Sequence, residues 1–269
     1  MNIKKYLKST IIKLSGNSII QYILDRSFDH ISYLLGIGSG DNPENSGEIE
    51  LFNLLNNSNS SFPIIIFDVG ANIGSFVDLA IKNINQKDFY IHSFEPSKYS
   101  FEILSNKYES NPRLILNNFG LSDKSVETTL YTNIEGSPLS SLYKRDLRSF
   151  DINFSKTEKI NLITLDEYCK QHNIHNIDLL KLDIEGHELD ALRGANELLK
   201  AKKIKMISFE FGGTNIDSRT FLKDFFNYFD KFNIPNIFRI TPSGKLFQMY
   251  PYREKFEQFI CQNILVICR

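Results

Sequence analysis

Short apolar runs alternate with segments of helical spacing along most of the chain, and this alternation constrains the fold more than any other feature. The apolar run Ile64–Phe67 is typical of a parallel strand that is buried on both faces, and residues Val77–Ile84 follow it with helical spacing. Strands that alternate with helices favour an α/β fold with a doubly wound, mostly parallel sheet and helices on both faces. Further strands are expected at Phe89–Phe94, Leu114–Leu116, Ile177–Leu182, Met206–Phe211, Ile237–Thr241 and Asn263–Cys268, and further helices at Phe101–Tyr108, Leu189–Leu199 and Thr220–Phe229.

Length and charge restrict the class of protein rather than its activity. The 269 residues allow one large α/β domain or two small ones. The formal net charge of −1 argues against bulk attraction to nucleic acid. No apolar stretch approaches the ~18 residues of a membrane-spanning helix, and the odd count of three cysteines suits free thiols. We therefore expect a soluble, cytoplasmic protein with no transmembrane segment and no nucleic-acid partner.

Residues 1–60 differ from the rest of the chain. The apolar residues of Ile12–Leu35 fall near one side of a helix, and Gly36–Gly47 is rich in Gly, Ser, Asn and Asp, as linkers are. We expect residues 1–60 to form a helical cap and linker and residues 61–269 to form the main domain. An alternative is contact with a membrane surface, because four basic residues precede the apolar face: Lys4, Lys5, Lys8 and Lys13.

Four of the expected strands end in acidic residues: Asp68, Glu95, Asp183 and Glu210. In a doubly wound sheet, ligands bind in the crevice outside the carboxyl ends of the strands. A single acid at a strand end is most often a solvated loop residue. Four acids at successive strand ends favour a shared site at this edge of the sheet.

The turn after the first strand has the sequence Asp68-Val69-Gly70-Ala71-Asn72-Ile73-Gly74. Gly70 and Gly74 permit a tight turn and a close approach of the backbone to a ligand. This is not the dinucleotide fingerprint, because Asn72 stands where a second glycine would admit a pyrophosphate. The carboxylate of Asp68 would repel that anion and attract a cation such as S-adenosylmethionine, and Glu95 lies where an acid accepts hydrogen bonds from ribose hydroxyls.

Five ordered motifs resemble those of FkbM-family methyltransferases, and the resemblance covers roughly Phe62–Gly212, with a serine-bearing insertion between the third and fourth main strands. It implies a class I methyltransferase-like fold, S-adenosylmethionine as the cofactor, and a β-hairpin insertion at about residues 123–163. The motifs are Asp68–Gly74, Phe94-Glu95-Pro96, Gly120–Asp123, Thr164-Leu165-Asp166 and Lys181–Glu188. The predicted cofactor-binding residues are Asp68, Gly70, Ala71, Asn72, Gly74, Glu95, Pro96, Phe119 and Gly120.

The turn after the fourth main strand supplies the candidate catalytic residues, Asp183, Glu185 and His187. Asp183 is placed to orient an acceptor hydroxyl or to take its proton, and histidine has a pKa suited to proton transfer near neutrality. The alternative is that Glu185 and Glu188 only favour the helix N-terminus that follows. Ser140 and Ser141 lie in the insertion, where a flap would cover the acceptor.

A metal site is open at this stage. Asp183, Glu185 and Glu210 offer oxygen ligands of the kind that Mg²⁺ prefers, but no spacing in the sequence demands a metal.

We therefore expect an O-methyltransferase that acts on a hydroxyl of a sugar, a glycan precursor or another hydroxylated metabolite. Two other readings stay open: a catalytically silent S-adenosylmethionine-binding or scaffold protein, and a nicotinamide-dependent oxidoreductase. The sequence leaves the acceptor, the methylated position and the oligomeric state undetermined.

Overall fold

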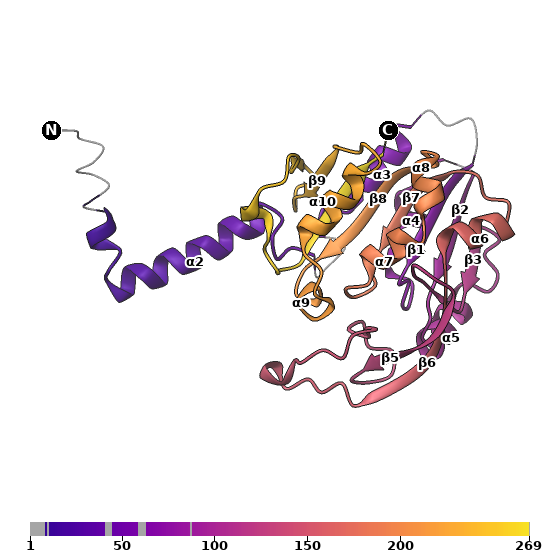
Figure 1. Ribbon diagram of the computed structural model, residues 1–269, viewed down its shortest axis with the longest axis horizontal. Helices are drawn as coiled ribbons and strands as arrows, with labels where there is room; N and C mark the ends of the chain where they lie inside the picture. The colour runs from indigo at the N-terminus through magenta and orange to yellow at the C-terminus, as the bar shows by residue number, and fades with distance from the viewer. Residues whose placement is uncertain (1–8, 10, 41–44, 59–62, 87, 269) are drawn as a thin grey trace.

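A computed structural model describes residues 9, 11–40, 45–58, 63–86 and 88–268 of the chain (Figure 1). Some of the expectations above concern other residues. Lys4, Lys5 and Lys8, the middle of the Gly36–Gly47 linker, Phe62 and the proposed boundary near residue 61 lie outside the described residues.

Within the described part of the chain, eight strands form one mixed sheet in the order β10-β9-β11-β8-β7-β1-β2-β3. Neighbouring strands from β3 through β8 are parallel, whereas β11 runs antiparallel to both β8 and β9. The strands are β1 (Ile64–Val69), β2 (Phe89–Phe94), β3 (Leu114–Asn117), β7 (Ile177–Leu182), β8 (Ile204–Phe211), β9 (Ile237–Ile240), β10 (Leu246–Gln248) and β11 (Gln262–Ile267). The expected mostly parallel, doubly wound sheet is confirmed.

Helices cover both faces of this sheet because alternate strand residues point to opposite sides. In β1, Ile64 and Ile66 pack with one group of helices, and Phe67 and Val69 pack with the other. The first group is α3 (Ile49–Asn56), α4 (Ser75–Asn83) and α5 (Lys98–Tyr108). The second group is α6 (Leu165–Gln171), α7 (Glu188–Arg193), α8 (Asn196–Lys200) and α10 (Leu222–Asp230). Each fully buried Leu or Phe in these two cores stabilises the fold by about 1.5–3 kcal/mol.

A three-stranded sheet lies beside the main one, in the order β4-β6-β5 (Figure 1). It comprises β4 (Gly120–Leu121), β5 (Val126–Thr132) and β6 (Lys156–Ile163), and β5 and β6 form the antiparallel pair expected for the insertion. The insertion also contains the short 3₁₀ helix η1 (Arg148–Phe150). A second 3₁₀ helix, η2 (Glu254–Phe256), and the short helix α9 (Thr214–Ser218) lie nearer the C-terminus of the chain.

Strand register brings the carboxyl ends of the central strands to one edge. Val69 is paired with both Phe94 and Leu182, and Leu182 is paired with Phe209. The residues that follow these strands therefore start from neighbouring points, as a site at the carboxyl edge requires.

The helix predicted over Leu189–Leu199 is wrong in one respect, because two short helices occupy this segment. Helix α7 ends at Arg193 with Gly194 as its C-cap, and α8 begins at Asn196. The carboxylate of Asp166 accepts hydrogen bonds from the backbone N–H groups of Glu197 (2.8 Å) and Leu198 (3.1 Å), which caps the second helix. The apolar residues keep helical spacing across the break between α7 and α8, so the sequence pattern does not indicate it.

The described part of the predicted N-terminal cap is helical, and its helix α3 packs into the core, whereas its longer helix does not. Helix α2 (Ser18–Leu34) projects from the body of the molecule (Figure 1), and Ser32 is its one buried residue. Its apolar side chains are exposed: Ile23, Phe28 and Leu34 keep 55%, 56% and 70% of their surface. The periodicity that predicts a helix does not specify a partner for its apolar face. Among the described helices, none is long and apolar enough to cross a membrane.

Candidate active site

The turn after β1 is built around the backbone of Gly70, whose N–H donates to the carbonyl of Phe94 (2.9 Å). Gly70 has a φ of +85°, and a Cβ there would lie 1.8 Å from the carbonyl oxygen of Asp183. Only glycine allows this approach. The turn after β1 and the turn after β7 are therefore locked against each other.

Glu95, at the end of β2, holds the same turn from the other side. One carboxylate oxygen accepts from the backbone N–H of Asn72 (2.8 Å) and the other from that of Ser97 (2.8 Å). Burial raises the pKa of Glu95 to about 7, although both hydrogen bonds oppose the shift. Each oxygen keeps a further lone pair that can accept from a ligand hydroxyl.

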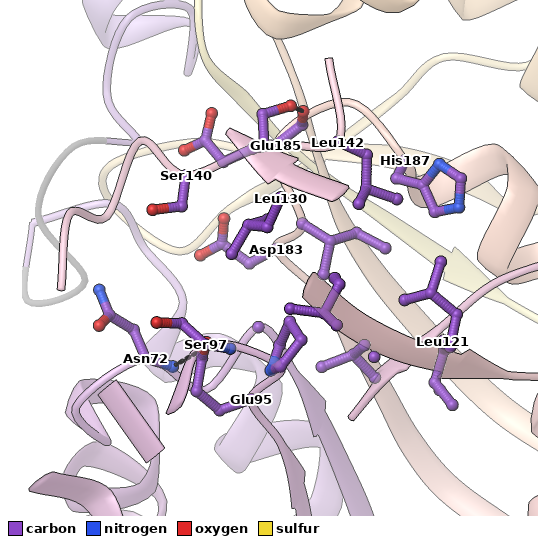
Figure 2. Close-up of a pocket in the computed structure, with 18 of the residues that line it drawn as sticks. Asn72, Glu95, Ser97, Leu121, Leu130, Ser140, Leu142, Asp183, Glu185 and His187 are labelled. Atoms are coloured by element: carbon purple, nitrogen blue, oxygen red, sulfur yellow. Dashed lines mark hydrogen bonds between the residues drawn. The ribbon is translucent and has the colours of Figure 1, made fainter. Parts of the chain in front are cut away.

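A cleft opens between these turns and the insertion (Figure 2). Asn72, Ser97 and Glu95 lie on one side of it, and Glu185 and His187 lie on the other. The insertion supplies an apolar wall and a serine-bearing loop, namely Leu130, Ser137, Pro138, Ser140, Ser141, Leu142, Ile160 and Leu162. The Ser141 hydroxyl donates to the carbonyl of Glu185 (2.7 Å), so the loop is tied to the turn after β7. Ser140 and Ser141 do line the cleft, where a flap was predicted.

Asp183 follows β7 directly and lies between the two sides of the cleft (Figure 2). Its Oδ2 accepts from Nζ of Lys181 (2.9 Å), and its side chain is 41% exposed. Lys181 is itself buried, and its ammonium lies over the ring of Phe76. Asp183 is therefore held by a fixed cation and open to a ligand.

The turn after Asp183 is fixed by Glu188, which is buried. One of its oxygens accepts from the backbone N–H groups of Ile184 (3.2 Å) and Gly186 (3.1 Å). Burial raises the pKa of Glu188 to about 7. Glu188 thus has a local structural role at the start of the helix, which was the alternative interpretation for both Glu185 and Glu188.

Glu185 has a different role. It adopts a φ of +52°, an uncommon conformation for a residue other than glycine, and it accepts from Nη1 of Arg145 (3.0 Å). Arg145 also lies 3.4 Å from Asp217. Burial raises the pKa of Glu185 to about 9, and the nearby Glu210 and Asp183 add to the effect. Strained backbone of this kind concentrates at functional sites.

His187 lines the cleft, but both ring nitrogens have partners. Nε2 lies 2.9 Å from the hydroxyl of Ser122, and Nδ1 lies 3.2 Å from that of Tyr143 and 3.5 Å from Asp190. Burial lowers the pKa of His187, which favours the neutral ring. The arrangement suits a residue that braces the cleft wall better than a free base.

A second cavity of about 520 Å³ adjoins the cleft, with a volume typical of small-molecule sites. We call it the chamber. The two spaces share Gly70, Asn72, Pro138, Asp183 and Glu185. Charged side chains line much of the chamber: Glu48, Arg145, Lys181, Asp183, Glu185 and Glu210. Burial and the charge of Asp183 raise the pKa of Glu210 to about 8.

The carboxylates suggested as magnesium ligands, Asp183, Glu185 and Glu210, all line the chamber. Among the residues that the structure describes, however, no group of three or more His, Cys, Asp or Glu side chains is arranged to hold a metal ion.

Residues 68–233, more than half of the chain, match the model of the methyltransferase FkbM domain. The chain belongs to the FkbM methyltransferase family. The family match, together with the mostly parallel sheet and its two helical layers, confirms the class I methyltransferase-like fold.

Two curated methyltransferases resemble this FkbM-family chain over 149 residues. Hexuronic acid methyltransferase AglP of Haloferax volcanii is 24% identical over 55% of this chain and 56% of its own length. Methyltransferase 1 of Beauveria bassiana is 28% identical over 49% of this chain and 58% of its own length. The chain thus spans a little over half the length of these relatives. The crystal structure of methyltransferase FkbM from Methylobacillus flagellatus KT is 18% identical, with a TM-score of 0.47 over 76% of this chain and 43% of that one.

Most of the predicted site residues of this FkbM-family protein do meet at the two spaces. Gly70, Asn72, Glu95, Pro96, Gly120, Asp183, Glu185 and His187 line the cleft, and Ala71 lines the chamber.

Three predicted cofactor-binding residues lie elsewhere. Asp68 is fully buried inside β1, where burial raises its pKa to about 6 against the opposing charge of Lys181. Gly74 begins α4, and a Cβ there would lie 2.6 Å from the ring of Tyr108, so this glycine serves packing. Phe119 packs against Phe94 and Tyr168 in the core. Residues beside a turn that lines the cleft do not all face the cleft, because alternate side chains of a strand point into the core.

Sequence reasoning missed Arg145, the buried role of Lys181, Glu48 and the apolar wall of the insertion. Arg145 lies in a polar loop without periodicity, and Glu48 precedes the domain motifs. Lys181 carried a signal, since it is the one charged residue in an otherwise apolar stretch of strand, Leu179–Leu182.

Proposed function

We propose that the protein transfers the methyl group of S-adenosylmethionine to a hydroxyl oxygen of a sugar or another hydroxylated metabolite. One observation carries the proposal: the turns after β1, β2 and β7 meet at a cleft that shares Asp183 with the adjoining chamber. The cleft would hold the cofactor and the chamber the acceptor. The name of the relative AglP supports a sugar derivative as acceptor, with a sugar acid as one class to be tested.

The cleft residues fit S-adenosylmethionine. The side-chain oxygen of Asn72 is buried without a hydrogen-bond partner among the described residues, and it lines both spaces. Glu95 offers acceptors for ribose hydroxyls, and the apolar side chains of Leu130, Leu142 and Leu162 offer a wall for an adenine ring. Asp68, buried beneath the turn with both oxygens unpartnered in the described chain, favours a cation above it.

Bound in the cleft, S-adenosylmethionine would supply an electrophilic methyl group and a thioether leaving group. The protein contributes position and proton transfer. The turn after β1 and the insertion would position the two reactants against each other, and positioning of this kind can make a large contribution to the rate. Asp183 would take the proton of the acceptor hydroxyl as that oxygen is methylated. Lys181 keeps the Asp183 carboxylate in place through its ion pair at 2.9 Å.

Mass spectrometry tests this proposal. Candidate sugars, nucleotide-sugars and glycan extracts are incubated with S-adenosylmethionine and the protein, and a product heavier by one CH₂ group is sought. The expected result is such a product together with stoichiometric S-adenosylhomocysteine. Binding of the cofactor without a methylated product from any hydroxylated class would favour the catalytically silent reading instead.

A further inference from the structure

More carboxyl groups than cations line the chamber. Four carboxyl groups line it, those of Glu48, Asp183, Glu185 and Glu210, against two cations, Arg145 and Lys181. The count concerns only the residues that the structure describes around this cavity.

Both cations are already paired with acids. Arg145 lies 3.0 Å from Glu185 and 3.4 Å from Asp217, and Lys181 lies 2.9 Å from Asp183. The Arg145 side chain is only 9% exposed. An arginine that recognises a ligand carboxylate needs free N–H donors that face the ligand. Arg145 instead faces two carboxylates of its own chain: Nη1 donates to Glu185, and Nε lies in an ion pair with Asp217, although it makes no hydrogen bond within the described residues.

Glu48 and Glu210 form the surplus, because neither takes part in an ion pair within the described residues. Glu48 is buried and accepts a hydrogen bond from the hydroxyl of Ser46 (3.0 Å). Glu210 lies near the end of its strand, where burial and the charge of Asp183 raise its pKa to about 8. Burial likewise raises the pKa of Glu48. A ligand cation would favour the ionised form of these carboxyl groups, and a ligand anion would oppose it.

We propose that the chamber accepts a hydroxylated acceptor without an acidic group, of the chemical class of an uncharged or amino-substituted sugar, and discriminates against uronic acids and sugar phosphates. This inference rests on the proposed function. The carboxyl groups accept hydrogen bonds from sugar hydroxyls and attract an ammonium group, whereas a ligand carboxylate would give up part of its hydration beside further carboxyl groups and find no cation that lacks an acidic partner. The cofactor's single net positive charge does not balance two surplus acids.

Calorimetry on the full chain saturated with S-adenosylhomocysteine tests the inference with three probes on one ring: methyl glucosaminide, methyl glucoside and methyl glucuronide. The glucosaminide is expected to bind tightest, and the glucuronide at least ~10-fold more weakly than the glucoside, since its carboxylate would lose hydration without gaining a free cation. Equal or tighter binding of the glucuronide overturns the inference, and so does the absence of binding by all three.

The first titration, with S-adenosylhomocysteine alone, separates this inference from the proposed function. If that ligand does not bind, the proposed function fails and the inference fails with it. If it binds and the glucuronide is preferred, only the inference fails.

The variant Glu210→Gln removes one surplus charge at nearly constant shape. It is expected to narrow the difference in affinity between glucosaminide and glucuronide by ~5–10-fold. Glu102→Gln makes the same change of net charge on the exposed surface of α5 and is expected to leave that difference unchanged. If Glu210→Gln does not fold, Glu48→Gln replaces it. A folded variant with the wild-type difference contradicts the assignment of the discrimination to these acids.

Discussion

The cofactor cleft and the chamber share the wall around Gly70 and Asp183, but the chain builds them by different means. Backbone dominates the cleft: glycine, positive φ and the N–H groups that Glu95 accepts. Charged side chains from separate segments dominate the chamber, from Glu48 before the sheet to Arg145 in the insertion. Under the proposed function, the cleft would suit one fixed cofactor, and the chamber would be the part that sequence change adapts to a new acceptor.

The largest effect is expected on the chamber side. Asp183→Asn removes the proposed proton acceptor and should lower turnover by ~10²–10⁴-fold, while the affinity for S-adenosylmethionine stays within about twofold. Steady-state kinetics and calorimetry on the same preparation measure both. Asp151→Asn, an exposed aspartate in a left-handed conformation that asparagine tolerates, is the matched control. An Asp183→Asn protein with wild-type turnover would move the base to another group, His187 being the first candidate.

The shared wall comes next. Gly70→Ala places a methyl group against the carbonyl of Asp183 and should lower the free energy of unfolding by about 2–4 kcal/mol, with loss of cofactor binding. Gly244→Ala separates strain from collision, because Gly244 has a similar φ of +79° while its Cβ would meet Glu50 at an ordinary 3.5 Å. That control should cost about 1–2 kcal/mol. Equal losses in urea unfolding of the two variants would mean that the two turns are not locked together.

Two buried glutamates make similar hydrogen bonds but differ in whether they line the cleft. Glu95 and Glu188 each accept two backbone N–H groups, but only Glu95 lines the cleft. At pH 8, above the pKa of about 7, Glu95→Gln should lower cofactor affinity by about 1.5–3 kcal/mol, since it loses a charge-assisted acceptor. Glu188→Gln should change affinity far less in the same calorimetric titration. Equal effects would assign Glu95 a purely structural role.

The smaller effect concerns pH. The pKa of Glu188 is raised from 4.5 to about 7, chiefly by burial. Between these values the unfolded chain loses a proton that the folded chain keeps, so the free energy of unfolding falls as pH rises from about 4.5 to 7 and then levels off. Glu188→Gln should reduce that fall by about 1–2 kcal/mol. Urea unfolding at several pH values measures it, and an unchanged slope would contradict the burial argument.

The sequence predicts the sheet and the cleft better than it predicts the chamber. The sheet and the cleft follow from apolar runs that end in Asp68-Val69-Gly70, Glu95 and Asp183, because parallel strands bring their carboxyl ends together whatever loops connect them. Arg145 and Glu48 reach the chamber through tertiary packing that no local spacing records. The sequence likewise does not show which side chains point inward, so it does not reveal that Asp68 is fully buried or that Phe119 packs against the core. Helix α2 shows a second limit of prediction from sequence. Its apolar spacing correctly predicts a helix but does not indicate what its apolar face contacts.

Calorimetric titration of the full chain with S-adenosylmethionine, S-adenosylhomocysteine and NAD tests the central claim most directly. The account predicts saturable binding of both sulfur ligands at one site, weakened by Glu95→Gln, and no binding of NAD, because Asn72 and the buried Asp68 oppose a pyrophosphate at the turn after β1. Tight NAD binding without any response to S-adenosylmethionine or S-adenosylhomocysteine would contradict it and return the protein to the oxidoreductase reading.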